Sequence, residues 1–251
     1  MIRRLLHIVG MASLTTASIA AQTSTGPQKE PPPAWELQLG ASYVATSGNT
    51  DTSSTGADFG FKRRWIVWQL ESAATAVRAS NHGVSTAERY LGSVRGQRAL
   101  SDLLALTTGF KAERDRFAGL DFRSILDAGL TWALVRQTLW TLDGLTALTY
   151  NHENPVRGVD QDNPGALLQA LSKLKFSDTA DTTQRFSFYP NFQSRDDYRS
   201  EAELTLQAAL NKRLALKLGY LFRYDNLPVP GFEKTDNTTT ASIVLKMQAA
   251  R

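Results

Sequence analysis

The strongest constraint on the fold is the period-two pattern of Arg213–Tyr224, RLALKLGYLFRY. In an extended chain, alternate side chains point to opposite faces, so the even-numbered residues of this segment share one face. That face is apolar and ends in tyrosine, whereas Lys217 and Arg223 lie on the other. Strands in water-soluble sheets usually have about five or six residues, and a run about twice as long suits a bilayer-crossing strand. The segment therefore predicts a transmembrane strand with one face toward lipid and one toward a lumen.

The same pattern recurs along the chain and predicts about twelve strands in about six hairpins. The expected strands are residues 35–43, 54–61, 65–79, 88–98, 103–113, 122–134, 139–150, 166–176, 182–189, 198–210, 213–224 and 238–247. The connections alternate between longer polar loops, such as residues 81–87 and 151–164, and short turns, such as residues 62–64. This asymmetry is typical of outer-membrane barrels. We expect an all-β fold, a transmembrane antiparallel up-and-down β-barrel spanning residues 35–248.

Two other interpretations of the pattern stay open. Residues 201–218 are rich in strong helix formers, but a helical arrangement would place Lys217 among the leucines, so strands are favoured. A soluble periplasmic barrel or sandwich would need shorter strands and would have no reason to sort aromatic residues by strand end.

The N-terminal segment is expected to direct export. Arg3 and Arg4 precede an apolar stretch, and small residues at Ser18-Ile19-Ala20 suit signal-peptidase cleavage, so residues 1–20 are predicted to be a signal peptide. Residues 21–34 are polar and end in prolines, which predicts a disordered periplasmic lead-in. The predicted location is the outer membrane of a Gram-negative bacterium.

Aromatic residues are sorted by strand end. The tryptophans lie near the short turns, and the tyrosines, Tyr189 among them, lie toward the longer loops. Amphipathic rings favour the two membrane–water interfaces, so two aromatic girdles are expected. The girdle residues are predicted to include Trp35, Trp132, Trp140, Tyr150, Tyr220 and Tyr224.

The alternation also assigns individual side chains to lipid or lumen. The predicted lipid-facing residues are Leu214, Leu216, Leu218 and Phe222. The predicted lumen-lining residues are Lys111, Glu113, Arg123, Asp127, Lys217 and Arg223. Such charges either set the selectivity of a wet pore or pair across the barrel into a plug, and a barrel of this width is compatible with both. The balance of signs slightly favours internal pairing.

Composition and motifs indicate little enzymatic chemistry. The chain has no cysteine, a formal net charge of +4, and no basic cluster of the kind that binds nucleic acid. A Ser/His hydrolase would rely on His82 or His152, with Ser80, Ser85 or Asp160 nearby in sequence, but no G-x-S-x-G motif supports it. Residues 160–165 begin like a calcium loop, yet Leu171 occupies the position of the bidentate glutamate. No cofactor, metal or nucleic-acid partner is expected.

Three segments carry a family resemblance. They are residues 40–52, which contain Ser47-Gly48-Asn49-Thr50-Asp51, the acidic-aromatic stretch 110–121, and residues 224–237. In this order they resemble the YdiY-like family of salt-induced outer-membrane proteins. The resemblance implies a barrel among outer-membrane lipid and lipopolysaccharide, inserted by the barrel-assembly machinery. Such barrels usually finish on an aromatic residue, whereas this chain finishes with residues 247–251, MQAAR.

The functional expectation follows from these points together. We expect a non-enzymatic envelope protein, either structural or a narrow pore for small solutes, and the resemblance adds a link to salt or osmotic stress. The alternative is an outer-membrane barrel enzyme that hydrolyses lipid or peptide.

Overall fold

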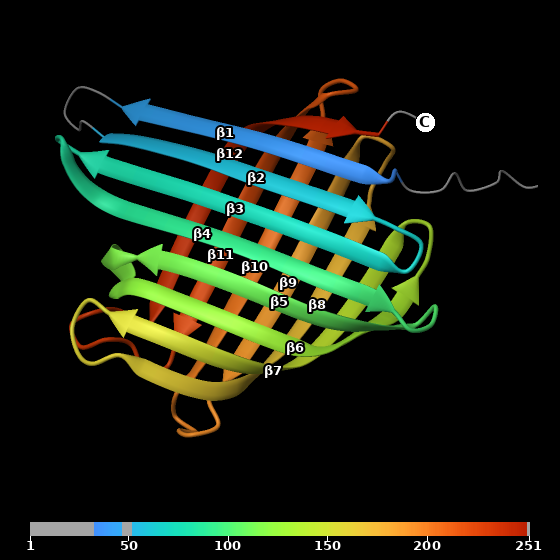
Figure 1. Cartoon of the computed structure of the whole chain (residues 1–251). Helices are drawn as coiled ribbons and strands as arrows, with labels where there is room; N and C mark the ends of the chain where they lie inside the picture. Colours follow the sequence, from blue (N-terminus) through green and yellow to red (C-terminus); the bar gives the residue numbers. More distant parts are fainter. Residues whose placement is uncertain (1–32, 47–51, 250–251) are drawn as a thin grey trace, which may run out of the picture. The chain divides into compact units, whose positions relative to one another are not determined.

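The computed structural model describes residues 33–46 and 52–249 and shows a closed antiparallel β-barrel (Figure 1). The predicted signal peptide, most of the lead-in and residues 47–51 of the first outer loop lie outside the described residues. Twelve strands form the barrel: β1 (Trp35–Thr46), β2 (Thr52–Arg64), β3 (Trp68–Asn81), β4 (Val84–Ala99), β5 (Leu104–Asp115), β6 (Leu120–Arg136), β7 (Trp140–Pro155), β8 (Gln161–Lys175), β9 (Ala180–Pro190), β10 (Tyr198–Ala209), β11 (Leu214–Asp225) and β12 (Thr235–Gln248). The predicted fold class is confirmed.

Each strand pairs with its neighbours in sequence, and β1 closes the ring against β12. This closing register runs from Glu36 opposite Gln248 to Ala41 opposite Ile243. Closure satisfies the backbone groups that an open sheet edge would leave unpaired, which is what a strand-built protein needs in lipid. The beginning of β1 and the end of β12 lie at the end of the barrel with the short turns, which we take as the periplasmic end.

Several strands are longer than the alternation predicts. The expected loop 151–164 shrinks to residues 156–160, because β7 continues to Pro155 and β8 begins at Gln161. The expected loop 81–87 is a two-residue hairpin turn in which His82 and Gly83 have φ of 49° and 78°. Left-handed φ at both central residues is the geometry of a tight hairpin turn that matches strand twist. Polar residues such as Ser85 continue the strand there because they lie toward the aqueous rim.

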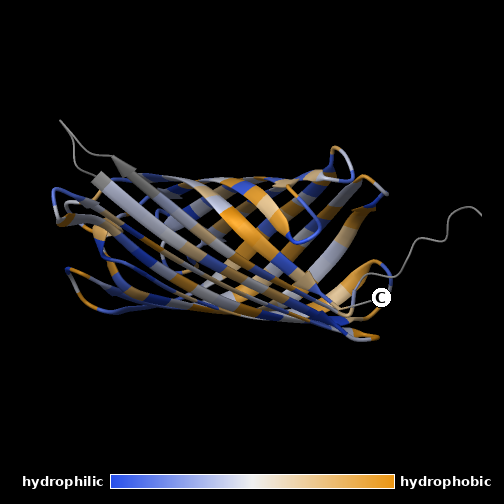
Figure 2. Ribbon diagram, turned by 90° about the horizontal axis from the view of Figure 1, so that it is seen from above, coloured by the Kyte–Doolittle hydropathy of each residue, from blue (hydrophilic) through white to orange (hydrophobic). Residues whose placement is uncertain are grey.

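Side chains sort by strand face as they do in a barrel whose outside meets lipid. Figure 2 shows hydrophobic and hydrophilic segments alternating along the strands. Large apolar residues such as Leu106, Phe110 and Leu126 are about half exposed on the outside. The buried apolar cluster lies inside instead, on β6 to β9: Ile125, Leu145, Ala147, Leu167 and Tyr189.

The remaining ordered element is a short 3-10 turn, Arg116–Ala118, between β5 and β6. Asp115 caps it by accepting a hydrogen bond from the Ala118 backbone N–H, and Gly119 ends it in the left-handed conformation at φ 84°. Over residues 33–46 and 52–249, no helix is long and apolar enough to cross a membrane.

Candidate functional site: a charged network across the lumen

The candidate site is a set of ion pairs that join opposite walls of the barrel. A salt bridge between strands that are not neighbours can form only through the interior, so these pairs identify the lumenal face directly. They connect β5 with β10 and β11, β7 with β10, and β2 with β11. In the ring of twelve strands, β5 and β11 are six positions apart and therefore diametrically opposed.

Glu113 on β5 is the centre of this network. One of its carboxylate oxygens lies 2.9 Å from an Arg89 guanidinium nitrogen on β4 and 2.9 Å from Arg223 Nη1 on β11. The other Arg223 terminal nitrogen lies 2.6 Å from an oxygen of Asp115. The Glu113 side chain is only 2% exposed. Two guanidinium groups therefore compensate a carboxylate that is almost completely removed from water, as a buried charge requires.

A second bridge crosses the lumen beside the first. Lys111 on β5 donates to both carboxylate oxygens of Glu201 on β10, at 2.8 and 3.0 Å. The Lys111 ammonium also lies 5.5 Å from the ring centre of Tyr189, and the Arg199 guanidinium lies 6.0 Å from the same ring. Cations favour the electron-rich face of an aromatic ring. Tyr189 thus lies between two of the cations and helps to fill the lumen at this level.

A third group of ion pairs joins β6, β7 and β10. Glu153 on β7 accepts hydrogen bonds from Arg123 on β6 and from Arg199 on β10, both at 2.7 Å. All three side chains are less than a fifth exposed. Arg123 also approaches Asp225 of β11 at 3.9 Å. This group spreads the network around the circumference, so that ion-paired side chains from six strands meet near the outer end of the barrel.

Two further pairs lie nearer the middle of the strands. Lys217 on β11 contacts Asp58 on β2 at 2.6 Å. Arg95 on β4 binds Asp127 on β6 through two hydrogen bonds, at 2.8 and 2.7 Å, and also donates to Thr107. The parallel geometry of the guanidinium and carboxylate groups is the strong form of such a pair.

The structure places every residue predicted to line the lumen in one of these interior pairs. The residues are Lys111, Glu113, Arg123, Asp127, Lys217 and Arg223. Their alternation was visible in the sequence, whereas their partners were not. Glu113 and Arg223 are 110 positions apart, and only the barrel brings them together.

The residues predicted to face lipid lie on the opposite face. Leu216 and Leu218 are exposed, and Leu214 and Phe222 are half-buried among neighbours on the same outer surface. The predicted girdle residues also share outward positions: Trp35, Trp132, Trp140, Tyr150, Tyr220 and Tyr224. Trp140 donates to Ser172 and Tyr220 donates to Asn237, so their polar tips have partners. Tyr189 departs from the expected girdle: it lies inside the lumen, only 8% exposed, because its register on β9 matches inward-facing Arg199 on β10.

One lumenal ion pair at mid-strand is more open. Arg185 on β9 and Glu203 on β10 form an ion pair at 3.0 Å, but their side chains are 46% and 39% exposed. These two strands are neighbours, so this pair does not cross the lumen. The charged interior is thus tightly packed near the outer end and more exposed on this wall farther down.

The two histidines expected to lie near outer loops have different surroundings. His82 lies in the β3–β4 hairpin turn with its Nδ1 2.5 Å from the Asn81 side-chain oxygen. His152 lies on β7 with its Nδ1 3.0 Å from Asp162 of β8. Ser80 and Ser85 contact other side chains, Ser53 and Arg78 respectively. Over the described residues, no group of three or more His, Asp or Glu side chains could hold a metal ion.

The barrel is closed and antiparallel, its first and last strands are paired, its outer surface is apolar and its interior is charged. This is the architecture of proteins that span the bacterial outer membrane. The chain is an outer-membrane β-barrel. It belongs to the family described as "Protein of unknown function, DUF481", whose model matches residues 39–247. It is 24% identical over 219 residues to YdiY of Escherichia coli strain K12, covering 85% of this chain and 83% of that protein. The predicted YdiY-like family is confirmed.

A solved structure has the same architecture. An outer membrane channel from Pseudomonas putida F1 is 10% identical, with a TM-score of 0.52 over 88% of this chain and 98% of that chain. The NanC porin is also 10% identical, with a TM-score of 0.47 over 87% of this chain and all of that chain. At 10% identity, the likeness to the Pseudomonas channel shows the fold and no more.

Proposed function

We propose that the protein is a narrow pore for small solutes whose width is set by the ion-pair network across its lumen. The observation that carries the proposal is the contact between Arg223 and Glu113, which brings opposite walls of the barrel together. A barrel of twelve strands is wide enough to enclose a passage, so the side chains that cross it determine what passes. The pore function is non-enzymatic.

The composition of the constriction supports passage of small polar solutes or ions over large ones. Arginines and carboxylates alternate through the network, so a passing solute meets donors and acceptors of both signs. Interior charges of this kind govern selectivity in other pores. The packed outer half of the lumen limits the passage of solutes. The exposed Arg185–Glu203 pair indicates that the lumen is more open to water farther from the outer end.

Planar-bilayer conductance of the refolded protein tests the proposal. The wild type should show small, resolvable conductance steps. A Glu113→Ala, Arg223→Ala double variant removes both sides of the central bridge without changing the net charge, and should raise the single-channel conductance several-fold. The matched control is Arg185→Ala, Glu203→Ala, which deletes the same residue types from an exposed pair between neighbouring strands and should change conductance little.

The outcomes separate a pore from a structural plug. If the wild type and the Glu113/Arg223 variant both fail to conduct at any voltage while remaining folded, the pore proposal is wrong. The barrel then serves as a closed structural element of the envelope. If conductance increased equally in both double variants, removal of any lumenal ion pair would widen the pore. The Glu113–Arg223 bridge would then not be what sets the pore width.

The remaining expectations for the envelope context rest on the sequence. We infer that residues 1–20 direct export and are cleaved, and that outer-membrane lipid, lipopolysaccharide and the barrel-assembly machinery are the partners. The link to salt or osmotic stress rests on the family resemblance. It fits a lumen bridged by ion pairs, because dissolved salt weakens those that water can reach.

A further inference from the structure

Three polar residues form a row on the outer, lipid-facing side of the barrel near its extracellular end. Ser124 on β6 is directly opposite His152 on β7, and His152 is directly opposite Asp162 on β8. The Nδ1 atom of His152 lies 3.0 Å from a carboxylate oxygen of Asp162. This contact engages Nδ1 of His152, so Nε2 is the ring nitrogen that would act as the base. A serine, a histidine and a carboxylate in that order are the parts of an activated nucleophile.

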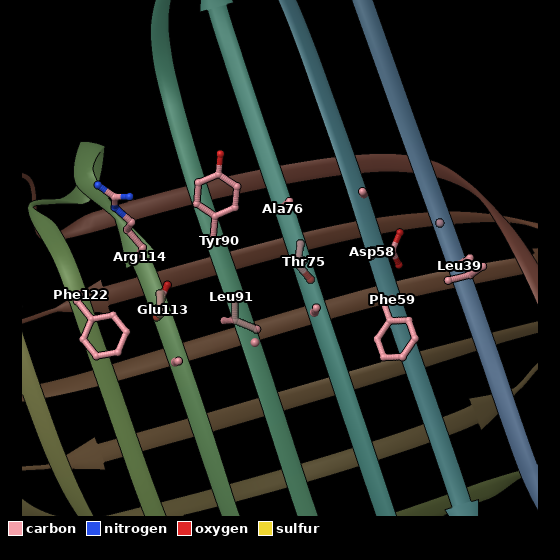
Figure 3. A pocket seen from close by; sticks show the side chains of 15 residues that line it. Leu39, Asp58, Phe59, Thr75, Ala76, Tyr90, Leu91, Glu113, Arg114 and Phe122 are labelled. Carbon is pink, nitrogen blue, oxygen red and sulfur yellow. The ribbon is translucent and has the colours of Figure 1, made fainter.

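An apolar groove lies beside this row. It has a volume of about 730 Å³ and crosses the outer surface from β1 to β6. Its floor is made of small residues on β2 to β5: Ala57, Ala74, Ala76, Gly92 and Ala112. Figure 3 shows Phe59 and Leu39 at one end, Phe122 at the other, and Tyr90 and Arg114 along the upper side. Small side chains in a row between bulky ones leave an apolar channel in the surface, and such a channel suits a hydrocarbon chain.

The groove leads to the polar row through the strand register. Gly92 is opposite Ala112 on β5, and Ala112 is opposite Ser124 on β6. The same register line begins at Leu39, the fifth residue of β1 from its periplasmic end, and reaches Asp162, the second residue of β8 from its outer end. Because barrel strands are tilted by about 35–45°, a line across the strands climbs through the membrane. An acyl chain in the groove would therefore run from the hydrocarbon layer up to Ser124.

From this juxtaposition we propose that Ser124, His152 and Asp162 form a hydrolytic site for fatty-acyl esters of outer-leaflet lipids, with the groove holding the acyl chain. The site lies on the lipid side of the barrel wall and is separate from the lumenal network. It revises the enzyme alternative suggested by the sequence: His152 is retained, but its partners are Ser124 and Asp162, and not Ser80, Ser85 or Asp160.

The chemistry balances without a cofactor. His152 takes the Ser124 hydroxyl proton as Oγ forms a bond to the ester carbonyl carbon, whose π electrons move to oxygen. Collapse of this intermediate breaks the ester C–O bond, and the leaving alcohol receives the proton from His152. Water then attacks the acyl-enzyme by the same route and releases the fatty acid and the serine. Asp162 is a positioning residue that orients the imidazole and stabilises its cationic form.

Arg114 is a cation on the same outer face as Ser124. It lies on β5 two residues beyond Ala112, which places it diagonally from Ser124 on the same face. Its recorded ion pair, to Asp121, is long at 3.4 Å and about 40% exposed on both sides. The guanidinium would have to leave Asp121 and turn toward Ser124 to face the carbonyl oxygen as negative charge develops there.

Ser124 and His152 are opposite each other on β6 and β7, and no direct hydrogen bond joins their side chains. Hydrogen bonds of catalytic groups are commonly loose until substrate binds. We expect the acyl chain, once seated in the groove, to bring the ester to Ser124 and to exclude water from the pair.

The first experiment combines hydrolysis with covalent labelling. Refolded full-length protein is assayed with mixed micelles of phosphatidylethanolamine carrying a labelled acyl chain and, in a second arm, with labelled lipid A, which distinguishes the two lipid sources. Fatty acid should be released, and a fluorophosphonate probe should modify Ser124, as read by peptide mass spectrometry. Ser124→Ala and His152→Ala should each lower turnover at least about 100-fold. Asp162→Asn should lower kcat and leave KM unchanged.

The second experiment tests the groove with a pair of glycines on one strand. A side chain added at Gly92 meets nothing within 4 Å, so Gly92→Leu should fold and fill the groove. KM for the lipid should rise several-fold. Gly96→Leu is the matched control, because it also adds a side chain on the outer face of β4, where the added Cβ makes an ordinary 3.9 Å contact with Thr108. His82→Ala is the control for the other histidine, and both controls should leave turnover unchanged.

Every outcome bears on the proposal once heat-modifiable gel migration shows that the proteins are folded. The hydrolytic site is disproved if folded wild-type protein releases no fatty acid from either lipid and Ser124 stays unlabelled. Turnover that survives Ser124→Ala, or labelling at another serine, would also overturn it. Should Ser124→Ala fail to fold, labelling of the wild type, and its loss in excess lipid, decides the question.

Discussion

Removing the charge of Glu113 should strongly destabilise the barrel. Glu113→Gln keeps the side-chain volume but removes the carboxylate charge that Arg89 and Arg223 both contact at 2.9 Å. Breaking a buried ion pair by removing one partner costs about 3–5 kcal/mol, because the remaining charge is uncompensated. Asp115 still lies 2.6 Å from Arg223 and 3.9 Å from Arg89, so the expected loss is about 3 kcal/mol, the lower end of that range.

The measurement is equilibrium urea unfolding in lipid vesicles, followed through the fluorescence of the five tryptophans. Glu203→Gln is the matched control: it breaks the Arg185 ion pair, whose partners are both more than a third exposed, and should cost about 0–1 kcal/mol. A double-mutant cycle of Glu113→Gln with Arg223→Gln should show a coupling of about 1–3 kcal/mol between opposite walls. A loss below about 1 kcal/mol, or no coupling, would refute the network as a structural bridge.

Two further predictions concern the barrel wall. Leu218→Arg places a charge on the lipid face of β11 and should lower the free energy of unfolding by about 2–4 kcal/mol in vesicles; an unchanged midpoint would mean that this face does not meet lipid. Gly129→Ala should impair folding, because an added Cβ would overlap the Thr146 carbonyl oxygen and the Ala147 backbone. Gly92→Ala, where the added atom meets nothing within 4 Å, is its control, and similar heat-modifiable migration of both would contradict the steric argument.

The sequence allowed the barrel and the faces of its strands to be predicted, because alternation is a local property. In Arg213–Tyr224 the lipid-facing leucines and the lumenal Lys217 follow from parity alone. Parity predicts the face on which a residue lies. It does not predict the register between strands, which determines which residues of other strands lie next to it. The pairing of Glu113 with Arg223 and the row from Ser124 to Asp162 both depend on it.

Tyr189 shows the limit of composition as a guide. A tyrosine near an outer strand end suits an interfacial girdle, and the three predicted girdle tyrosines do lie on the outer face. Tyr189 has the inward parity of Ser187, and its ring meets Lys111 and Arg199 instead of lipid. A cation on the far wall is not visible from the local sequence of β9, so the preference of the ring for the interface was overridden by tertiary contacts.

The bridges across the lumen also bear on the order of assembly. Lys111 and Glu201 are 90 positions apart in the sequence, and Glu113 and Arg223 are 110 apart. Each ion pair can therefore form only after β10 and β11 have come to lie opposite β5. Contacts made late contribute little to the folding barrier and act mainly against the reverse reaction. We therefore expect the sheet to close into a barrel before these ion pairs form. Once formed, the ion pairs slow the unfolding of the closed barrel.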